Sequence, residues 1–298
     1  MLAPVVLFTY NRPLHLKRTI SALAKNKLIA ETELYIFQDG SKNSSDKEKA
    51  EEVKKLIEEF TSAKTIHKIF RKENYGLAKS VIAGVTEVFK SHDAVIVLED
   101  DLVTSPNFLD YMNSGLKYYE NNSRIHSITG YSLPLKTKLL IDEDVFFSPR
   151  AGSWGWATWK DRWTKPDWDV SDYEEFKRSL RQQKEFNVGG EDLTPMLKAQ
   201  MRGDINSWAI RWSYYHFKMN GLCVYPKISK VNHIGNDSEG THVSSTKKYD
   251  VEIDDTNRIT SFVDNVSVNK IILKEINQLV RPSFIRKIIN FFKYDFLK

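Results

Sequence analysis

The sequence predicts an α/β fold with a mostly parallel sheet flanked by helices, and three observations support this prediction. Short apolar segments alternate with segments whose apolar residues recur every three or four positions through the first hundred residues. Three of the apolar segments end in polar clusters, at 9–12, 38–41 and 99–101. The chain of 298 residues is 41% hydrophobic and 28% charged, so it can bury a core. We therefore expect a Rossmann-like sheet whose strand ends meet at one ligand cleft.

Each element is predicted from its own residues. The expected strands are 4–8, 34–37, 66–70, 95–98, 125–129 and a strand that begins at 222. The first three helices are predicted from apolar stripes at Leu16, Ile20 and Leu23, at Val53, Leu56, Ile57 and Phe60, and at Leu77, Val81, Val85 and Val88. Later helices are expected at 107–120, 191–202 and 207–219.

The alternation weakens after residue 105, and the chain has no linker long enough to separate a second domain. We expect a single domain over 1–270, with a nucleotide-binding half at 1–105 and an acceptor half at 106–270. The remaining segment, 271–298, is expected to carry a terminal amphipathic helix.

Composition excludes several functions. The single cysteine, Cys223, rules out an intramolecular disulfide or a thiolate metal cluster, and its apolar neighbours predict a buried strand. The net charge of +5 is mild and no nucleic-acid module is recognisable, so we expect no nucleic-acid partner. The N-terminal apolar run leads directly into Thr9 and reads as a strand, not as a signal peptide. Since no stretch approaches the ~20 apolar residues that cross a bilayer, we expect a cytoplasmic protein, soluble or peripheral.

Glu99, Asp100 and Asp101 are the most informative residues. Three adjacent carboxylates at the end of an apolar strand repel one another unless a cation lies among them. Oxygen ligands of this kind suit Mg²⁺ or Mn²⁺, bound together with substrate phosphates. The alternative is a solvated acidic turn that caps the next helix. By itself the motif indicates a metal and a phosphate, and it does not identify a sugar.

The loops after the first two strands narrow the choice of ligand. Asp39 is suited to accept hydrogen bonds from a nucleobase or a ribose. Arg12 either pairs with a diphosphate or a base, or is a surface residue that opens a helix. The sequence has neither the Gly-x-Gly-x-x-Gly turn after its first strand nor a Gly-x-x-x-x-Gly-Lys loop. Nicotinamide enzymes of the Rossmann type and Walker-type NTPases are therefore disfavoured.

A series of motifs resembles the GT-A nucleotide-sugar glycosyltransferases, over roughly residues 4–245. The closer likeness is to the branch that resembles animal N-acetylglucosaminyltransferase I and its bacterial sugar-transferase relatives. The motifs are Thr9-Tyr10-Asn11-Arg12, Phe37-Gln38-Asp39-Gly40-Ser41, Asn74-Tyr75-Gly76, Leu98-Glu99-Asp100-Asp101, the segment 152–159, the segment 207–212, and the strand and loop at 226–242.

The resemblance implies roles for individual residues. Arg12 and Asp39 would hold the nucleotide, and Asp100 would contact its ribose. Asp101 would bind Mn²⁺ or Mg²⁺ at the diphosphate, and Glu99 would face the donor sugar. Further residues of the donor site would be Thr9, Tyr10, Asn74, Lys79, Trp154 and Gly155.

The loop at 232–243 resembles a lid that orders over bound donor. His242 or His233 would then lie near the diphosphate or the metal, and in the alternative both are surface residues. The aromatic cluster between Trp154 and Trp168 suits a carbohydrate-stacking surface and an ordinary core equally well.

The general base is the point at which this sequence departs from the family pattern. The resemblance implies an aspartate just before the Ser-Trp-Ala-Ile-Arg-Trp segment, but Asn206 occupies that position, and an amide cannot serve as a base. Either Asp204, Glu191 or Asp192 takes the proton, or the match is displaced by a residue or two, or the chain is an impaired form.

The C-terminal segment 281–298 is both basic and apolar. Phe284, Ile288, Phe292 and Phe296 recur every four residues, and basic residues lie off that stripe. The pattern suits either an interfacial helix on an anionic membrane or a terminal helix that docks on the core.

These observations predict an inverting transferase that moves a sugar from a UDP-sugar to a glycan or a lipid-linked oligosaccharide with Mn²⁺ or Mg²⁺. The expected setting is a bacterial cytoplasm, at the inner face of the plasma membrane. The alternatives are a non-catalytic nucleotide- or glycan-binding paralogue, which Asn206 favours, and a nucleotidyltransferase. The latter would be expected to carry a Gly-rich basic loop after the first strand, and residues 9–13 do not provide one.

Overall fold

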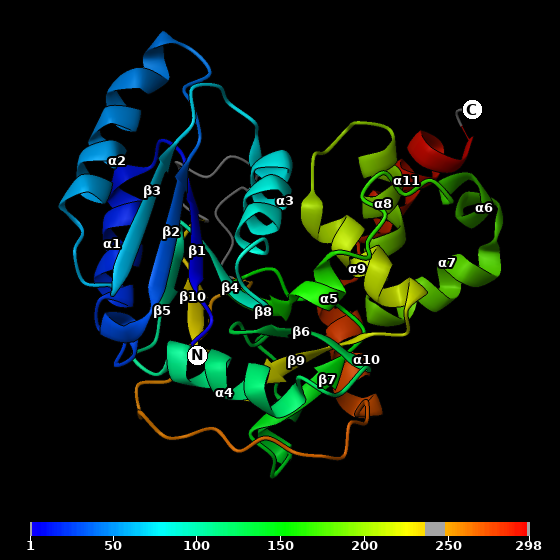
Figure 1. Cartoon of the computed structure of the whole chain (residues 1–298). Helices are drawn as coiled ribbons and strands as arrows, with labels where there is room; N and C mark the ends of the chain where they lie inside the picture. Colours follow the sequence, from blue (N-terminus) through cyan, green and yellow to red (C-terminus); the bar gives the residue numbers. More distant parts are fainter. Residues whose placement is uncertain (1, 236–247, 297–298) are drawn as a thin grey trace.

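A central eight-stranded sheet organises the molecule, as the computed structural model shows for residues 2–235 and 248–296 (Figure 1). The strand order is β3-β2-β1-β4-β8-β6-β9-β7, and β10 and β5 form a separate two-stranded sheet. The strands are β1 Val5–Thr9, β2 Glu33–Gln38, β3 Thr65–Phe70, β4 Ala94–Glu99, β5 Leu102–Thr104, β6 Ile125–Thr129, β7 Val145–Ser148, β8 Trp156–Trp159, β9 Leu222–Pro226 and β10 Val231–His233.

Most pairs in the large sheet are parallel, which confirms the predicted fold class. β1 pairs with β2 and with β4, β2 pairs with β3, and β6 pairs with β9, all in parallel. β8 runs antiparallel to β4 and to β6, and β7 runs antiparallel to β9. The strands β7 and β8 were not predicted, because each has only four residues, all buried, and such a segment shows no alternation.

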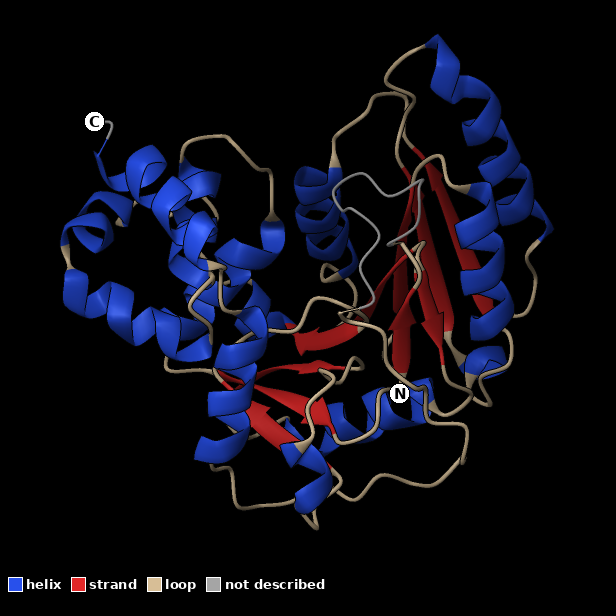
Figure 2. Cartoon of the chain, turned by 180° about the vertical axis from the view of Figure 1, so that it is seen from behind, coloured by secondary structure: helices blue, strands red, loops and turns tan. Residues whose placement is uncertain are grey.

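Helices lie on both faces of the sheet, as the alternating pattern predicts. The helices α1 and α2 cover one face of the strands β1–β3, and α3 lies on the other (Figures 1 and 2). The helices are α1 Pro13–Leu23, α2 Lys47–Glu59, α3 Leu77–Val88, α4 Phe108–Tyr119, α5 Lys160–Trp163, α6 Tyr173–Arg178, α7 Leu180–Phe186, α8 Leu193–Met201, α9 Trp208–Lys218, α10 Lys270–Val280 and α11 Phe284–Phe291.

The aromatic cluster after residue 154 belongs mainly to the core. Trp156 stacks on Trp163 and Trp208, with ring centroids 5.4 and 4.9 Å apart, and Trp212 packs beside them. All four rings are almost completely buried, together with apolar residues of α3. These four residues therefore belong to the core and do not form a carbohydrate-stacking surface. Cys223 is likewise fully buried in β9, as predicted.

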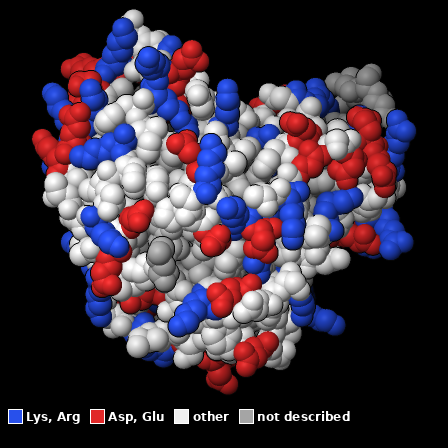
Figure 3. Space-filling view, in the orientation of Figure 1, with Lys and Arg blue, Asp and Glu red and all other residues white. Residues whose placement is uncertain are grey.

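The C-terminal segment contains two helices. In α10, Ile272, Ile276 and Val280 are buried, and the first two pack in a cluster with Phe146 of β7. The helix α11 follows after residues 281–283. Within the described ranges, no helix has the length and apolar character required to span a membrane. On the face shown in Figure 3, Lys and Arg are interspersed with Asp and Glu.

Candidate functional site

The sheet brings the predicted polar clusters to one edge. Because β4, β1 and β2 are adjacent and parallel, their carboxyl ends point the same way. Residues 9–12 follow β1, residues 39–41 follow β2, and Asp100 and Asp101 follow β4. The three loops therefore converge, as expected from the order of strands and helices.

Asp100 fixes the loop after β1. Its carboxylate accepts hydrogen bonds from the Thr9 hydroxyl at 3.0 Å and the Tyr10 backbone N–H at 3.2 Å, and it forms an ion pair with Arg12. Asp100 is buried, which raises the pKa of its carboxyl, while Arg12 and Thr9 oppose that rise. Arg12 is the last residue before α1. Its ion pair with Asp100 places it beside the end of β4.

Asp101 faces both a cation and an imidazole. Arg12 Nη1 lies 2.9 Å from Asp101 Oδ2, and His233 Nε2 lies 3.3 Å from the same oxygen. Burial alone would raise the pKa of Asp101, but the hydrogen bond from His233 and the charge of Arg12 outweigh it and lower the pKa below its ordinary value. Asp101 is therefore held as a carboxylate.

His233 reaches this position through the small sheet. β10 pairs antiparallel with β5, and the register sets His233 opposite Leu102, the residue that follows Asp101. The Ile234 N–H then donates to the Asp101 carbonyl at 2.9 Å. The imidazole stacks on Trp154, with ring centroids 4.3 Å apart and planes 3° from parallel. Both contacts fix the ring against Asp101.

Glu99 is the third carboxylate of the motif. Among the residues described, no hydrogen-bond partner of its side chain is recorded, and it lines the cavity described below. Burial and the neighbouring charge of Asp101 raise the pKa of Glu99 to about 8, although Arg12 lowers it. A carboxyl group in such a setting costs free energy when ionised, which is a frequent feature of functional sites.

A cavity of about 420 Å³ opens in front of these residues, and we call it the β4 cavity. Such a volume lies within the range of small-molecule sites. Its charged and polar lining residues include Arg12, Glu99, Asp101 and His233. The other lining residues, which we call the apolar wall, are mainly aromatic and aliphatic, including Trp154, Tyr131, Tyr225, Tyr249, Leu193, Met196 and Val280. Arg150 also lines it and pairs through both Nη atoms with Asp192, at 2.8 and 2.9 Å.

The donor set at Asp101 fits a divalent cation in part. Among residues 2–235 and 248–296, no group of three His, Cys, Asp or Glu side chains is arranged to hold a metal. A single carboxylate and a neighbouring imidazole suit Mn²⁺ or Mg²⁺ whose other ligands are phosphate oxygens and water. Gly235 adds room, since a Cβ at this position would collide with Asp101 Oδ2. The predicted ligand His242 lies outside the described residues.

Asp39 organises a second loop at the same sheet edge. Its carboxylate accepts hydrogen bonds from the backbone N–H groups of Tyr75 and Gly76 at 2.9–3.0 Å, where α3 begins. Asn74 donates to the Gly40 carbonyl at 2.7 Å, so the loops after β2 and β3 are tied together. A negative charge at a helix N-terminus is stabilised by the helix dipole.

The other predicted donor-site residues lie around these two loops. The Tyr10 hydroxyl donates to Asp46 at 2.7 Å, and burial together with this hydrogen bond raises the pKa of Tyr10 to about 12. The Lys79 ammonium lies 4.5 Å from the centre of the Tyr75 ring. Gly155 has a φ of +59°, and a Cβ there would collide with Val231. The close approach of β10 to this loop therefore requires glycine.

Two of the predicted base positions, Asn206 and Asp204, lie apart from the β4 cavity. Asn206 is exposed just before α9, where it lines a surface depression with Lys79 and Arg211. Its amide nitrogen would be 3.8 Å from a Cβ at Gly76, so it stands near the start of α3. Asp204 pairs with Lys293 at 3.1 Å.

The two remaining acids are also paired with basic residues. Glu191 pairs with Arg281 at 3.1 Å and with Lys287, both from the C-terminal segment. Asp192 is bound by Arg150 at the wall of the β4 cavity. A carboxylate in an ion pair is a weaker proton acceptor, because the neighbouring cation favours its charged form.

Sequence reasoning missed Arg150 and the tyrosines of the apolar wall. Tyr131, Tyr225 and Tyr249 come from three separate regions of the chain, and no spacing connects them. Arg150 follows the short strand β7, which had no periodicity of its own. The pairing of β7 with β9 and of β9 with β6 brings Arg150, Tyr225 and Tyr131 together, and the Tyr131 hydroxyl donates to the Tyr249 carbonyl at 2.7 Å.

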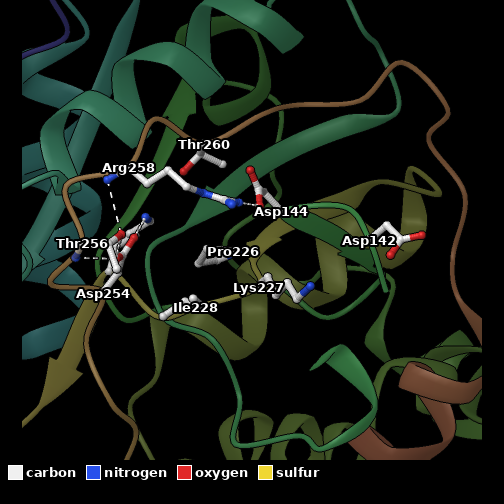
Figure 4. A pocket seen from close by; sticks show the side chains of 10 residues that line it. Asp142, Asp144, Pro226, Lys227, Ile228, Asp254, Thr256, Arg258 and Thr260 are labelled. Atoms are coloured by element: carbon white, nitrogen blue, oxygen red, sulfur yellow. Dashed lines mark hydrogen bonds and ion pairs between the residues drawn. The ribbon is translucent and has the colours of Figure 1, made fainter. Parts of the chain in front are cut away.

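A second cavity, of about 260 Å³, lies beside the end of β9, and we call it the β9 cavity (Figure 4). It contains a buried ion pair between Lys230 and Asp254. Asp254 also accepts hydrogen bonds from Asn107 at 3.2 Å and from the N–H and hydroxyl of Thr256 at 2.9 and 2.6 Å. At the rim, Arg258 pairs with Asp144.

The N-terminal part of the chain matches a known protein family. Residues 5–136 match the family model of glycosyl transferase family 2. The match covers less than half of the chain, and the α/β sheet to which the segment belongs is consistent with a GT-A glycosyltransferase fold. The segment contains β1 to β4, the carboxylates 99–101 and the loop of Asp39, which carry the resemblance found in the sequence. The narrower likeness to the N-acetylglucosaminyltransferase I branch stays a prediction.

Solved structures give weaker likenesses. TarS from S. aureus is 11% identical, with a TM-score of 0.45, over 79% of this chain and 61% of the other. The mannosyltransferase PcManGT from Pyrobaculum calidifontis, in complex with GDP-Man and Mn²⁺, is 10% identical, with a TM-score of 0.41, over 72% of this chain and 74% of the other.

Glucosyl-3-phosphoglycerate synthase from Mycobacterium tuberculosis, in complex with Mn²⁺, UDP and glucosyl-3-phosphoglycerate, is 12% identical, with a TM-score of 0.31, over 53% of this chain and 57% of the other. This chain thus spans less than two thirds of the length of TarS and of the synthase. At TM-scores below 0.5 these likenesses do not by themselves establish a shared fold. No curated protein matches the chain by sequence.

Proposed function

We propose that this chain is an inverting glycosyltransferase that moves a sugar from a UDP-sugar to a glycan or lipid-linked oligosaccharide. Asp101 and His233 would hold Mn²⁺ or Mg²⁺ at the donor diphosphate. The observation that carries the proposal is the pairing of these two side chains at the end of β4, inside the segment that matches glycosyl transferase family 2. A peripheral position at the inner face of a bacterial plasma membrane would suit a lipid-linked acceptor.

The electrostatics of the strand end suit the departure of a diphosphate. Breaking the bond from the anomeric carbon leaves negative charge on the leaving group. A bound divalent ion would supply positive charge to stabilise it. Arg12 contributes a fixed guanidinium beside the same carboxylates, which keeps it in place for the diphosphate oxygens. Thr9 and Asp39 support this arrangement by fixing the loops around it.

The apolar wall of the β4 cavity suits the sugar rings. Trp154 presents its ring there, held between Tyr131 and His233. Aromatic faces pack well against sugar C–H groups because both surfaces are apolar. The donor sugar would lie between Glu99 and this wall, and the acceptor would enter past Leu193 and Met196 of α8.

Glu99 and Asn206 are the two positions to weigh as the general base that takes the proton of the acceptor hydroxyl. Among the described residues, Glu99 is the carboxylate of the β4 cavity whose side chain makes no hydrogen bond, and its ionised form could accept the proton. Because its pKa is raised to about 8, this ionised form prevails only above about pH 8. Asn206, the family position, cannot accept one, and Asp204, Glu191 and Asp192 are engaged with basic residues. We therefore include Glu99 as the proton acceptor in the proposal.

Release of UDP from a panel of UDP-sugars with Mn²⁺ tests the activity. We expect turnover with at least one sugar, and a loss of about 100-fold in Asp101→Asn, because the amide weakens both the metal and the diphosphate site. Asp255→Asn, at an exposed position, is the matched control and should keep wild-type turnover. Mn²⁺-dependent UDP binding that survives Asp101→Asn unchanged would overturn the assignment of the metal site.

The identity of the base requires two further variants. Glu99→Gln should abolish transfer and leave UDP binding within a few-fold, because the amide keeps the shape but cannot accept a proton. Asn206→Asp should raise turnover if position 206 lies over the acceptor hydroxyl. An unchanged rate in Asn206→Asp would exclude that position.

A non-catalytic binding protein is the second candidate, and Asn206 favours it. Such a protein would bind UDP or a UDP-sugar with Mn²⁺ but release no UDP with any sugar or acceptor. Calorimetric binding measured beside the release assay separates the two functions.

A further inference from the structure

The helix α11 is docked with its polar side toward the protein. Lys287 pairs with Glu191, and Lys293, in the π-helical turn Phe292–Phe296 that follows, pairs with Asp204 at 3.1 Å. Lys287 and Asn290 line a groove against α7 and α8. A helix of a soluble domain ordinarily turns its apolar face to the core.

The apolar side of α11 is correspondingly exposed. Phe284 and Ile285 are 78% and 71% exposed, and Ile288, Ile289 and Phe292 are 43–50% exposed. At 100° per residue these five side chains fall on one side of the helix. The protein therefore presents a continuous apolar stripe to its surroundings, and such patches mark interaction sites.

Two further exposed apolar residues border the same groove. Leu180, at the start of α7, is 81% exposed, and Val188 is 46% exposed. Both line the groove together with residues of α11, although they come from a distant part of the sequence. The apolar surface is thus larger than the C-terminal helix that the sequence indicates.

The groove has more basic than acidic lining residues. Lys184, Lys198 and Lys287 line it, with the amides of Asn187, Asn277 and Asn290 between them, and Glu191 is its only acidic lining residue among those described. Residues 281–298 contain five Lys or Arg and one Asp. This local excess accounts for most of the net charge of +5.

We propose that α11, Leu180 and Val188 dock on the surface of an anionic lipid bilayer, with the exposed side chains of Lys184 and Arg286 facing the lipid headgroup phosphates. Apolar side chains that enter the interface and basic groups that face anionic headgroups are the two contributions such a surface requires. A second copy of the chain fits less well, since a symmetric contact would bring two strongly basic segments together.

The proposed docking face also lies close to the β4 cavity. Leu193 and Met196 of α8 line the cavity, and Thr194, Pro195 and Lys198 of the same helix line the groove. Only the width of α8, about 10 Å, separates the two. Val280, which ends α10 and is separated from α11 by three residues, also lines the cavity. The acceptor side would therefore lie within about one helix diameter of the membrane surface, where a lipid-linked acceptor lies; this last step rests on the proposed transferase function.

Flotation of the full-length protein with lipid vesicles tests the docking face. Binding to vesicles that contain phosphatidylglycerol should exceed binding to pure phosphatidylcholine and should fall as salt rises. Ile285→Ser with Ile289→Ser should lower the partition coefficient at least about tenfold, because two exposed apolar groups leave the interface. Ile259→Ser, at an 85% exposed position outside this face, is the control and should bind as wild type.

The outcomes separate this proposal from the transferase. Wild-type protein that does not float with anionic vesicles would overturn the docking face, as would an equal loss in Ile259→Ser. A dimer that sediments in wild type and is lost in the double variant, without vesicle binding, would assign the stripe to self-association and also overturn it. UDP release toward a soluble acceptor should be unchanged in the double variant whichever result is obtained, so a failure of membrane docking leaves the transferase proposal standing.

Discussion

The β4 cavity and the β9 cavity are each lined by carboxylates and basic residues, but the carboxylates differ in how many hydrogen-bond partners they have. In the β9 cavity, Asp254 accepts hydrogen bonds from Lys230, Asn107 and Thr256, and these bonds hold the pKa of its carboxyl well below its ordinary value. In the β4 cavity, Glu99 has no recorded partner among the described residues, and its pKa rises to about 8.

The difference distinguishes a structural ion pair from a site that awaits a ligand. A buried charge with all its partners is part of the fold, and its removal should only destabilise. A half-buried acid without hydrogen-bond partners lowers stability when it is ionised, so its removal should stabilise the protein, and such a cost is typical of functional sites. The β9 cavity is therefore read as structural and the β4 cavity as functional.

The largest expected effect is at Lys230. Lys230→Met would leave Asp254 buried with an uncompensated charge, and we expect the free energy of unfolding to fall by about 3–5 kcal/mol. Urea denaturation followed by circular dichroism measures this. Lys117→Met, on the exposed side of α4, is the control and should change stability by less than about 0.5 kcal/mol. A loss at Lys230 no larger than the control would contradict the structural role.

Arg12→Met should destabilise the protein less than Lys230→Met, and the loss should depend on bound metal and nucleotide. Arg12→Met removes the guanidinium shared by Asp100 and Asp101, and we expect a loss of about 2–4 kcal/mol in EDTA. Mn²⁺ with UDP should restore stability, by about 2.7 kcal/mol at 100 times the dissociation constant. Arg18→Met, on the exposed side of α1, should lose little and serves as the control. Thermal melts with and without Mn²⁺ and UDP measure both quantities.

Glu99→Gln should increase the free energy of unfolding, in contrast to the two preceding variants, which should lower it. The folded pKa of about 8 lies above the ordinary 4.5, so above pH 4.5 the unfolded chain releases its proton first and wild-type stability falls as pH rises toward 8. Glutamine carries no such penalty, so the variant should be more stable by about 1–3 kcal/mol at pH 8, with the gap closing toward pH 4.5. Urea denaturation at several pH values measures the gap. A gap that does not vary with pH would contradict a raised pKa at the half-buried Glu99.

The smallest effect is expected at Thr256. Thr256→Val removes one of several hydrogen bonds to Asp254 and should cost about 1 kcal/mol, because the remaining donors still satisfy the carboxylate. Combining it with Lys230→Met tests coupling. A double variant whose loss equals the sum of the single losses would mean that the two donors act independently.

The first half of the fold could be predicted because its signals are local. The apolar stripes of α1, α2 and α3 and the apolar runs of β1, β2 and β4 each lie within a few residues. The strands β7 and β8 could not, since four buried residues carry no period. The aromatic cluster after Trp154 was equally ambiguous, as a core and a binding surface use the same residues.

The sequence by itself determined that three carboxylates follow a buried strand of a parallel sheet, because both the strand and the acids are contiguous. Tertiary structure decided which partners they meet. His233 stands beside Asp101 only because β10 pairs with β5, and Asn206 stands outside the β4 cavity only because of where α9 begins. It also decided that α11 turns its apolar side outward, since the ion pairs of Lys287 and Lys293 lie with residues distant in the sequence. Contacts of this kind depend on how elements pack, and no local pattern encodes them.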